Sequence, residues 1–392
     1  MRKVMICSIC FIFAIIMFLF SNDSVEVMAK SMYNMFDNFT SDSYVLLDSN
    51  SGKILVKHNE NEKMQVASIC KLMTSLITLE KIEDGALKLD DLLTASEYAC
   101  SMEGSQAFLD AGSNYSVSEL LKSVIVASAN DSAVVLAEHI SGSESGFVSI
   151  MNKRAKELGM NNTVYANATG LPAPSQYSTA LDTSIILKEI SKYDLFVKNS
   201  NIWMDTFTHP SGRETELVNT NRLIKYYDKC KMGKTGFTDE AGYCLASMAS
   251  NNNLDLIAVT LKCDKPQDRF KESIDLFNYG FANFENVKII DKSEELRPIA
   301  TIGARNEMVD ICYEKDFYIL SSKGGNGEYD VRLDIVSSVK APMKTGDIVG
   351  KATILNKGKI EGEVNIILSE NVEKQQFGDI IKKIVKDWCL IK

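Results

Sequence analysis

The chain of 392 residues has only three histidines, and none stands in a pattern typical of catalysis. His58 ends an expected strand, His139 lies within an expected helix, and His209 precedes a proline in an expected loop. The motif Gly-x-Ser-x-Gly, which exposes the nucleophile of many hydrolases, is absent as well. A hydrolase with a Ser-His-Asp triad is therefore disfavoured.

Paired cysteines are also lacking. Outside the N-terminal apolar run there is no Cys-x-x-Cys and no Cys/His cluster, so neither a zinc site nor a disulfide framework is indicated. We expect no metal and no cofactor. The scattered cysteines outside that run are Cys70, Cys100, Cys230, Cys244, Cys263, Cys312 and Cys389.

An excess of positive charge is the third missing feature. The formal net charge is −9, which makes nucleic acid an unexpected partner. With 45% hydrophobic and 24% charged residues, the composition is that of an ordinary globular protein. The length allows one large domain and a smaller one.

The N-terminus has the layout of a secretory signal peptide. Residues 1–3 include Arg and Lys, residues 4–20 form an apolar run, and Val-Met-Ala at 27–29 provides small residues for cleavage. We expect residues 1–29 to be a signal peptide cleaved after Ala29. The alternative is an uncleaved anchor, but the run is shorter than the ~20 residues that a spanning helix needs. In either case the rest of the chain faces outward, and the protein is exported.

Residues 30–285 read as an α+β domain, an antiparallel sheet flanked by helices. Strands are expected on both sides of a turn at 48–52 and of a second turn at 251–253. Apolar residues at helical spacing predict helices at about 67–82, 117–126, 132–140 and 146–158, a further one in ALDTSIILKEISKY, and a closing one in PQDRFKESIDLFNYGFANF.

Two different segments follow this domain. Residues 286–370 show short β segments with turns, which predict a small all-β domain. Residues 371–392 predict an amphipathic helix with lysines opposite an apolar face, which reads as an interfacial anchor on a membrane surface. The alternative is a tail helix packed on its own domain. The apolar face comprises Phe377, Ile380, Ile381, Ile384, Val385 and Trp388, and the lysines are Lys382, Lys383 and Lys386.

Three short motifs stand well apart and in order: Ser68-x-x-Lys71, Ser128-Ala129-Asn130 and Lys234-Thr235-Gly236. Ser68 is expected at a helix start, where backbone N–H groups converge. The second motif is expected on the connection between two helices. The third is expected to open a strand, where Gly236 leaves room for a ligand along the strand edge.

A second set of the same tripeptides is a useful comparison. Residues 337–340 also read Ser-x-x-Lys, and residues 344–346 also read Lys-Thr-Gly. Both lie in one short strand and turn around Pro342, without room for a helix and sheet between them. We expect these residues to be ordinary solvated turn residues.

The first set resembles the motifs of the low-molecular-mass penicillin-binding proteins, specifically the serine-type D-alanyl-D-alanine carboxypeptidases. The segments SANDSAVVLAEHISGSESGFVSIMNKRAKELGMNNTVYANATGL, YSTALD, NTNRL and GKTGFTDEAGYCLASM are similar to that family in the same order. The likeness spans roughly residues 43–284. It implies the penicillin-binding/β-lactamase-like transpeptidase fold. One departure is Ile69-Cys70, where Met-Thr or Thr-Thr is common.

The residue types explain how such a site works. A serine needs a base, and Lys71 can serve if its amine is neutral, which burial and a second cation, Lys234, would favour. The resemblance implies the remaining roles. Ser128 relays a proton, and Asn130 binds both Lys71 and the substrate. The substrate is also bound by Lys234, Thr235 and Gly236. The oxyanion hole is formed by the backbone N–H groups of Ser68 and Phe237. It also implies peptidoglycan stem peptides as substrate and β-lactams as covalent inhibitors.

Three other functions remain open. A class A β-lactamase would need a Glu in an E-x-x-L-N motif, and Glu214 and Glu216 stand too close to Lys234 and head no such motif. A transpeptidase or endopeptidase on the same scaffold fits the motifs equally well. A non-catalytic wall-binding protein that keeps the fold is the third.

Overall fold

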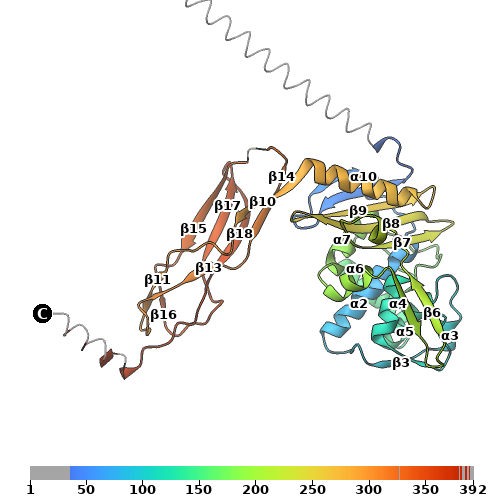
Figure 1. Ribbon diagram of the computed structural model, residues 1–392, viewed down its shortest axis with the longest axis horizontal. Coiled ribbons are helices and arrows are strands. Elements are labelled where there is room, and N and C mark those ends of the chain that lie inside the picture. Colours follow the sequence, from blue (N-terminus) through green and yellow to red (C-terminus); the bar gives the residue numbers. More distant parts are fainter. Residues whose placement is uncertain (1–35, 326, 379, 382–384, 386–387, 389–392) are drawn as a thin grey trace, which may run out of the picture. The chain divides into compact units, whose positions relative to one another are not determined.

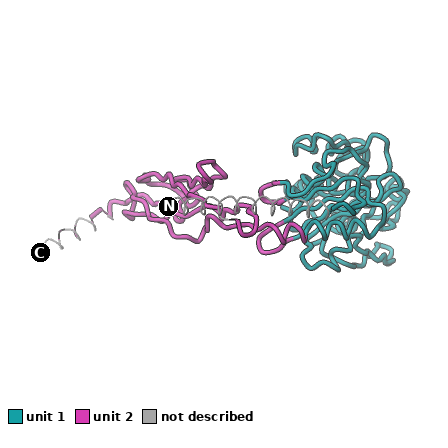
Figure 2. Tube along the Cα trace, turned by 90° about the horizontal axis from the view of Figure 1, so that it is seen from above, with its two compact units in different colours: residues 1–47, 54–249, 256–277 teal, residues 48–53, 250–255, 278–392 magenta. Residues whose placement is uncertain are grey.

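The computed structural model describes residues 36–392 except 326, 379, 382–384, 386–387 and 389–392. The predicted signal peptide therefore lies outside the described residues, as does part of the predicted C-terminal helix. The chain divides into two compact units (Figure 2). Unit 1 comprises Met1–Leu47, Ile54–Ala249 and Leu256–Phe277, and unit 2 comprises Asp48–Lys53, Ser250–Asp255 and Asn278–Lys392.

A five-stranded sheet with the order β2-β1-β9-β8-β7 forms the centre of the first unit. The pairs β1/β2 and β7/β8 are antiparallel, and β7 is an edge strand. Helix α10 lies on one face of this sheet, and helices α2 and α4–α7 lie beyond the other (Figure 1). The predicted α+β class is confirmed. The bounds are β1 Ser43–Asp48, β2 Ile54–His58, β7 Cys230–Thr238, β8 Gly242–Asn251, β9 Leu254–Cys263 and α10 Asp268–Asn283.

Helices α4 and α7 begin where the sequence provides capping groups. The Ser116 side chain accepts a hydrogen bond from the N–H of Glu119 at the start of α4, and Thr179 does the same for Asp182 at α7. Gly142 ends α5 in the left-handed conformation that suits glycine. The larger helices are α2 Lys71–Glu83, α4 Val117–Val126, α5 Asn130–Ser141, α6 Glu144–Glu157, α7 Ala180–Ile190 and α8 Asp194–Ser200.

Short elements connect these helices. They are the turn η1 Ala67–Cys70, helices α3 Glu97–Cys100 and α9 Leu223–Tyr226, and strands β3 Leu92–Thr94, β4 Asn114–Ser116, β5 Met204–Thr208 and β6 Glu214–Val218. Strands β5 and β6 form a hairpin.

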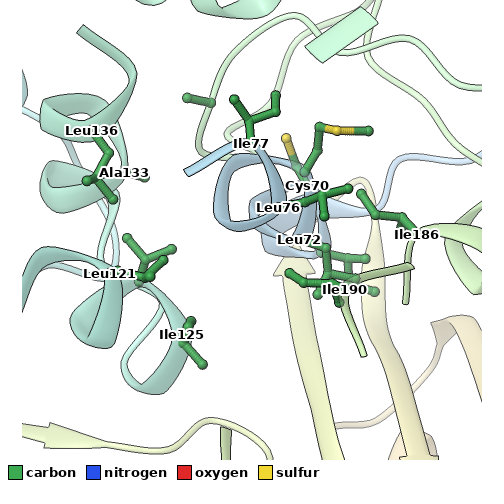
Figure 3. Packing of buried hydrophobic residues seen from close by; sticks show 14 of the residues in the cluster. Cys70, Leu72, Leu76, Ile77, Leu121, Ile125, Ala133, Leu136, Ile186 and Ile190 are labelled. Carbon is green, nitrogen blue, oxygen red and sulfur yellow. The ribbon is translucent and has the colours of Figure 1, made fainter. Parts of the chain in front are cut away.

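Helix α2 lies in the middle of the hydrophobic core. Its side chains Leu72 and Leu76 are fully buried among residues of α4, α5 and α7 (Figure 3). Burying a leucine stabilises a fold by roughly 1.5–3 kcal/mol. This packing fixes α2 on all sides, so the groups at its first turn have a defined position. The facing side chains include Leu121, Ile125, Ala133, Leu136, Ile186 and Ile190.

The second unit contains the predicted small all-β domain. Its largest sheet has the order β13-β18-β17-β15, and Ile354, Val364 and Ile366 in that sheet belong to a separate buried core. The strands are β10 Phe284–Ile290, β11 Ile299–Ile302, β12 Met308–Val309, β13 Ile311–Tyr313, β14 Phe317–Ser322, β15 Tyr329–Ile335, β16 Ser338–Lys340, β17 Ile348–Asn356 and β18 Lys359–Leu368.

Candidate active site

Ser68 and Lys71 lie in contact at the entry to α2. Ser68 belongs to the 3₁₀ turn η1, and Lys71 is the first residue of α2, so the predicted helix start is two short elements rather than one. A 3₁₀ turn brings side chains at i and i+3 onto one line. Lys71 Nζ lies 3.0 Å from Ser68 Oγ. The spacing Ser-x-x-Lys thus places an amine directly beside the hydroxyl.

Burial changes the chemistry of the Lys71 amine. The side chain is fully buried, and desolvation lowers its pKa to about 7, against the opposing effects of Cys70 and Asp131. Lys71 Nζ also donates to the backbone oxygen of Thr169 at 2.5 Å. A neutral amine can donate to this carbonyl and still offer its lone pair to Ser68. The sequence motifs did not single out Thr169, although it stands in the family-like segment NATGL.

Lys234 and Ser128 form the second part of the site. Lys234 Nζ donates to Ser128 Oγ at 2.8 Å and to its neighbour's carbonyl, Thr235 O, at 3.2 Å. Burial lowers the pKa of Lys234 well below its ordinary value, and the charges of Lys71 and Arg269 act in the same direction. Two amines and two hydroxyls from three distant motifs therefore lie near one another, with Lys71, Ser128 and Lys234 buried and Ser68 partly exposed.

Asn130 is the first residue of α5, so the predicted connection between helices is shorter than expected and the helix begins two residues earlier. Its Nδ2 donates to the carbonyl of Glu103 at 2.5 Å. Its Oδ1 is buried and, within the described part of the chain, has no hydrogen-bond partner. An unpartnered buried acceptor is costly in a folded protein, which makes this atom a candidate for contact with a ligand or a proton donor.

The third motif lies inside β7, not at its start as the sequence suggested, because the strand already begins at Cys230. Thr235 Oγ1 donates to Thr220 Oγ1 at 2.7 Å. A Cβ on Gly236 would lie 2.3 Å from the carbonyl oxygen of Val66, next to η1. Only glycine therefore lets the strand approach the segment that holds the nucleophile.

Phe237 follows the glycine and is half exposed, with its ring stacked on Tyr243 at a centroid distance of 4.3 Å. Behind these residues, Arg269 of α10 donates to the carbonyl of Gly236 at 2.9 Å. The sequence motifs did not single out Arg269 or Thr220, although Thr220 stands in the family-like segment NTNRL; both act through contacts between remote segments. The oxyanion-hole role of the Ser68 and Phe237 N–H groups remains a prediction.

Two residues at the site have backbone strain. Ala67 has φ 48° and Ser128 has φ 63°, in the left-handed region where a non-glycine residue costs roughly 1–2 kcal/mol. Each of them adjoins or belongs to a motif. Strain of this kind concentrates at functional sites, where the surrounding fold holds it.

Cys70 faces the hydrophobic core, not the cleft. Its Sγ lies 3.3 Å from the carbonyl of Asn167, and burial raises the pKa of the thiol to about 12 (Figure 3). At neutral pH it is a small packing residue and not a thiolate. Within the described ranges, no three His, Cys, Asp or Glu residues gather as metal ligands.

The second motif set lies in unit 2 and has no comparable cluster. Ser337, Lys340 and Lys344 are exposed, and the N–H of Lys344 donates to Asp347 in a turn. Thr345 donates to Asn371. These residues are solvated, as the sequence predicted, although Lys340 ends strand β16 and is not part of the turn.

Known proteins share the domain order of this chain. Residues 28–265 match the sequence model of the D-alanyl-D-alanine carboxypeptidases, and residues 284–374 match that of the C-terminal domain of penicillin-binding protein 5. The D-alanyl-D-alanine carboxypeptidase DacF of Bacillus subtilis is 34% identical over 352 residues, covering 89% of this chain and 90% of its own.

Solved structures agree with these matches. Penicillin-binding protein 5 of Haemophilus influenzae superimposes with a TM-score of 0.67 at 32% identity, over 86% of this chain and 98% of its own. Penicillin-binding protein D2 of Listeria monocytogenes, in its cefotaxime-bound form, gives a TM-score of 0.53 at 28% identity, over 62% and 98%. The chain therefore belongs to the D-alanyl-D-alanine carboxypeptidase family.

Proposed function

We propose that this protein removes the terminal D-alanine from peptidoglycan pentapeptide stems through an ester on Ser68. The observation that carries the proposal is the contact of the buried Lys71 Nζ with Ser68 Oγ at 3.0 Å. A second contact, of Lys234 Nζ with Ser128 Oγ, lies close enough for the charge of Lys71 to act on Lys234. The direct test is release of D-alanine by the purified protein from an N-acylated peptide ending in D-alanyl-D-alanine. No release above the blank would contradict the proposal.

The acylation step follows from the protonation state of Lys71. The neutral amine accepts the hydroxyl proton while Ser68 Oγ attacks the carbonyl carbon of the penultimate D-alanine. The oxyanion receives hydrogen bonds from backbone N–H groups, for which we propose Ser68 and Phe237. Each such donor is typically worth ~3 kcal/mol. The proton passes through Ser128 to the leaving nitrogen, the peptide C–N bond breaks and D-alanine departs.

Substrate recognition requires a cation near the terminal carboxylate. Lys234 and Thr235 provide an amine and a hydroxyl on the edge strand β7. An incoming carboxylate favours the protonated form of Lys234 and so opposes the effect of burial on its pKa. Water then attacks the Ser68 ester by the reverse proton path and frees the shortened stem peptide.

We infer that β-lactams acylate the same serine. A lactam amide attacked by Ser68 Oγ opens its ring and leaves an ester, while its carboxylate takes the place of the substrate's at Lys234. The cefotaxime-bound relative supports this proposal because the similarity covers most of its chain. No carboxylate is hydrogen-bonded to Ser68 or Lys71 among the described residues, which disfavours a class A β-lactamase.

The activity is expected to rise with pH through about 7. Below that pH, Lys71 carries a proton and cannot accept another, so kcat/KM should fall about tenfold for each pH unit. As pH increases past the pKa, the neutral fraction approaches one and this limb levels off. Measuring kcat/KM for D-alanine release between about pH 5 and pH 9 checks the assignment. A profile without this acidic limb would mean that Lys71 is not the base.

We propose that the protein works on the outer face of the cytoplasmic membrane, attached through residues 371–392. Phe377 and Trp388 are 77% and 81% exposed, which is unusual for large apolar side chains. No helix among the described residues is long and apolar enough to cross a membrane. An exposed apolar set beside lysines suits the interface of a bilayer with anionic lipids.

Deletion of residues 377–392 should release the protein from membranes while leaving D-alanine release unchanged. The apolar side chains that insert between the lipid headgroups are then missing. Sedimentation with vesicles of anionic and neutral lipid checks this, with the intact mature chain for comparison. Membrane retention of the deleted form in cells would instead support an uncleaved N-terminal anchor.

A further inference from the structure

The loop of residues 102–110 holds both ends of Asn130. The backbone N–H of Asn130 donates to Ser105 O at 2.7 Å, and its Nδ2 donates to Glu103 O at 2.5 Å. Gly104 between them has φ +80°, and a Cβ there would lie 3.0 Å from Asn130 Nδ2. The Glu103 carbonyl thus engages the Nδ2 end of the Asn130 carboxamide, and the Ser105 carbonyl fixes the backbone of the same residue. Its Oδ1 is the end left without a partner in the described structure.

Asp131 holds the second half of the same loop. Its carboxylate is fully buried and accepts hydrogen bonds from the N–H groups of Ala107 at 3.0 Å and Leu109 at 3.1 Å. These contacts come from the residue next to Asn130. Any shift of residues 107–109 is therefore transmitted directly to the start of α5.

The β5–β6 hairpin clamps this loop from outside through Arg213. One guanidinium nitrogen of Arg213, NH2, donates to the carbonyl of Phe108 and, at 2.8 Å, to Asp110 Oδ1. The hydrogen bond from Arg213 lowers the pKa of Asp110, so this carboxyl is ionised at neutral pH. Phe108 has φ 61°, a left-handed conformation that its surroundings must maintain. A single side chain therefore holds two successive acceptors on the loop.

We propose that Arg213 is a positioning residue for the reaction: it clamps the loop 102–110, whose Glu103 and Ser105 carbonyls hold the side-chain amide and the backbone N–H of Asn130. The proposal rests on the function proposed above. The hydrogen bonds of Arg213 go to Phe108, Asp110, His209 and Thr215, none of which belongs to the three motifs, so its effect passes through the loop. When the clamp opens, Asn130 loses its fixed orientation while Lys234 and Thr235 keep theirs.

This arrangement predicts a particular kinetic pattern. Binding of the substrate carboxylate depends on β7, which Arg213 does not contact, so KM should change little. Asn130 acts at the reacting bond, so kcat should fall. Small misplacements of a reacting constellation cost as much as 10²-fold in rate. We expect Arg213→Gln to lower kcat on the order of tenfold and to leave KM within about threefold.

The matched control is Asp205→Asn in the same hairpin. Asp205 pairs with Lys122 of α4 at 2.6 Å and accepts a hydrogen bond from the N–H of Thr206, so these contacts do not involve the loop 102–110. Arg213→Lys is a partial rescue, because it keeps the charge but lacks the planar fork of donors. For each variant we would measure kcat and KM for D-alanine release, melting temperature, and hydrogen exchange of peptides covering residues 102–110.

We expect kcat to be highest and equal in the wild type and Asp205→Asn, lower in Arg213→Lys, and lowest in Arg213→Gln. Exchange in residues 102–110 should be faster only in the Arg213 variants. Unchanged kcat in Arg213→Gln would overturn the inference, and so would faster exchange over the whole chain with a matching fall in melting temperature. A wild-type protein that releases no D-alanine would instead overturn the proposed function.

Discussion

Ser68→Ala is expected to abolish both release of D-alanine and covalent labelling by fluorescent penicillin. Without Oγ there is no atom to form the ester, and removal of a nucleophile from a serine enzyme costs as much as ~10⁶-fold in kcat. We expect a loss of roughly 10⁴-fold or more in kcat/KM. The variant should fold normally because the packing of α2 does not depend on this hydroxyl. D-Alanine release, gel fluorescence and mass spectrometry of the penicillin-treated protein check these outcomes.

Ser337→Ala is the matched control, since Ser337 begins the second Ser-x-x-Lys of the chain. It lies exposed in unit 2, so both activity and labelling should equal those of the wild type. Penicillin labelling that survives Ser68→Ala, or an adduct mapped elsewhere, would show that the nucleophile has been assigned to the wrong residue.

Lys71→Met should separate catalysis from stability. Methionine resembles the aliphatic part of lysine in size and flexibility, so it can fill the same buried space. It also removes an amine whose burial opposes the charged form, so the melting temperature should be unchanged or higher. The base is missing, however, and both kcat/KM and the rate of penicillin labelling should fall by roughly 10³-fold or more. Steady-state kinetics and thermal unfolding of the same preparation test both statements.

Lys340→Met serves as the control for this variant, because Lys340 has the equivalent position in the second motif and is exposed. It should affect neither rate nor melting temperature. If Lys71→Met were to lose activity together with its fold, the loss could not be assigned to the base. The pH profile of the wild type would then be the deciding measurement.

The sequence predicted the chemistry of the site better than its local geometry. The spacing of Ser68 and Lys71 is a local property, so the contact could be expected from the chain alone. The two lysines could be foreseen as neighbours because the motifs resemble those of one family. The limits of the elements were less accurate. The third motif lies within β7, because the strand begins before it: Cys230 and Met232 are buried and Lys231 between them is exposed, which is the alternation of a strand.

Contacts between remote segments could not be foreseen. The carbonyl of Thr169 that receives Lys71 Nζ comes from an irregular segment without a periodic pattern. Arg269 reaches the carbonyl of Gly236 from a helix 33 residues away in the sequence. A backbone carbonyl has no residue type, so its role leaves no trace in the sequence. Such contacts emerge only when the chain has folded.

The buried pair of amines also bears on drug resistance. Burial lowers the pKa of both amines, and an arriving carboxylate favours the protonated form of Lys234 whether it belongs to the peptide or to the antibiotic. The natural peptide and a β-lactam would both gain binding energy from this interaction with Lys234. A substitution of Lys234 that weakens binding of the antibiotic would also weaken binding of the peptide, so resistance gained in this way would cost the enzyme its activity. We therefore expect drug tolerance to depend on faster hydrolysis of the drug ester or on residues that only the bulkier drug contacts.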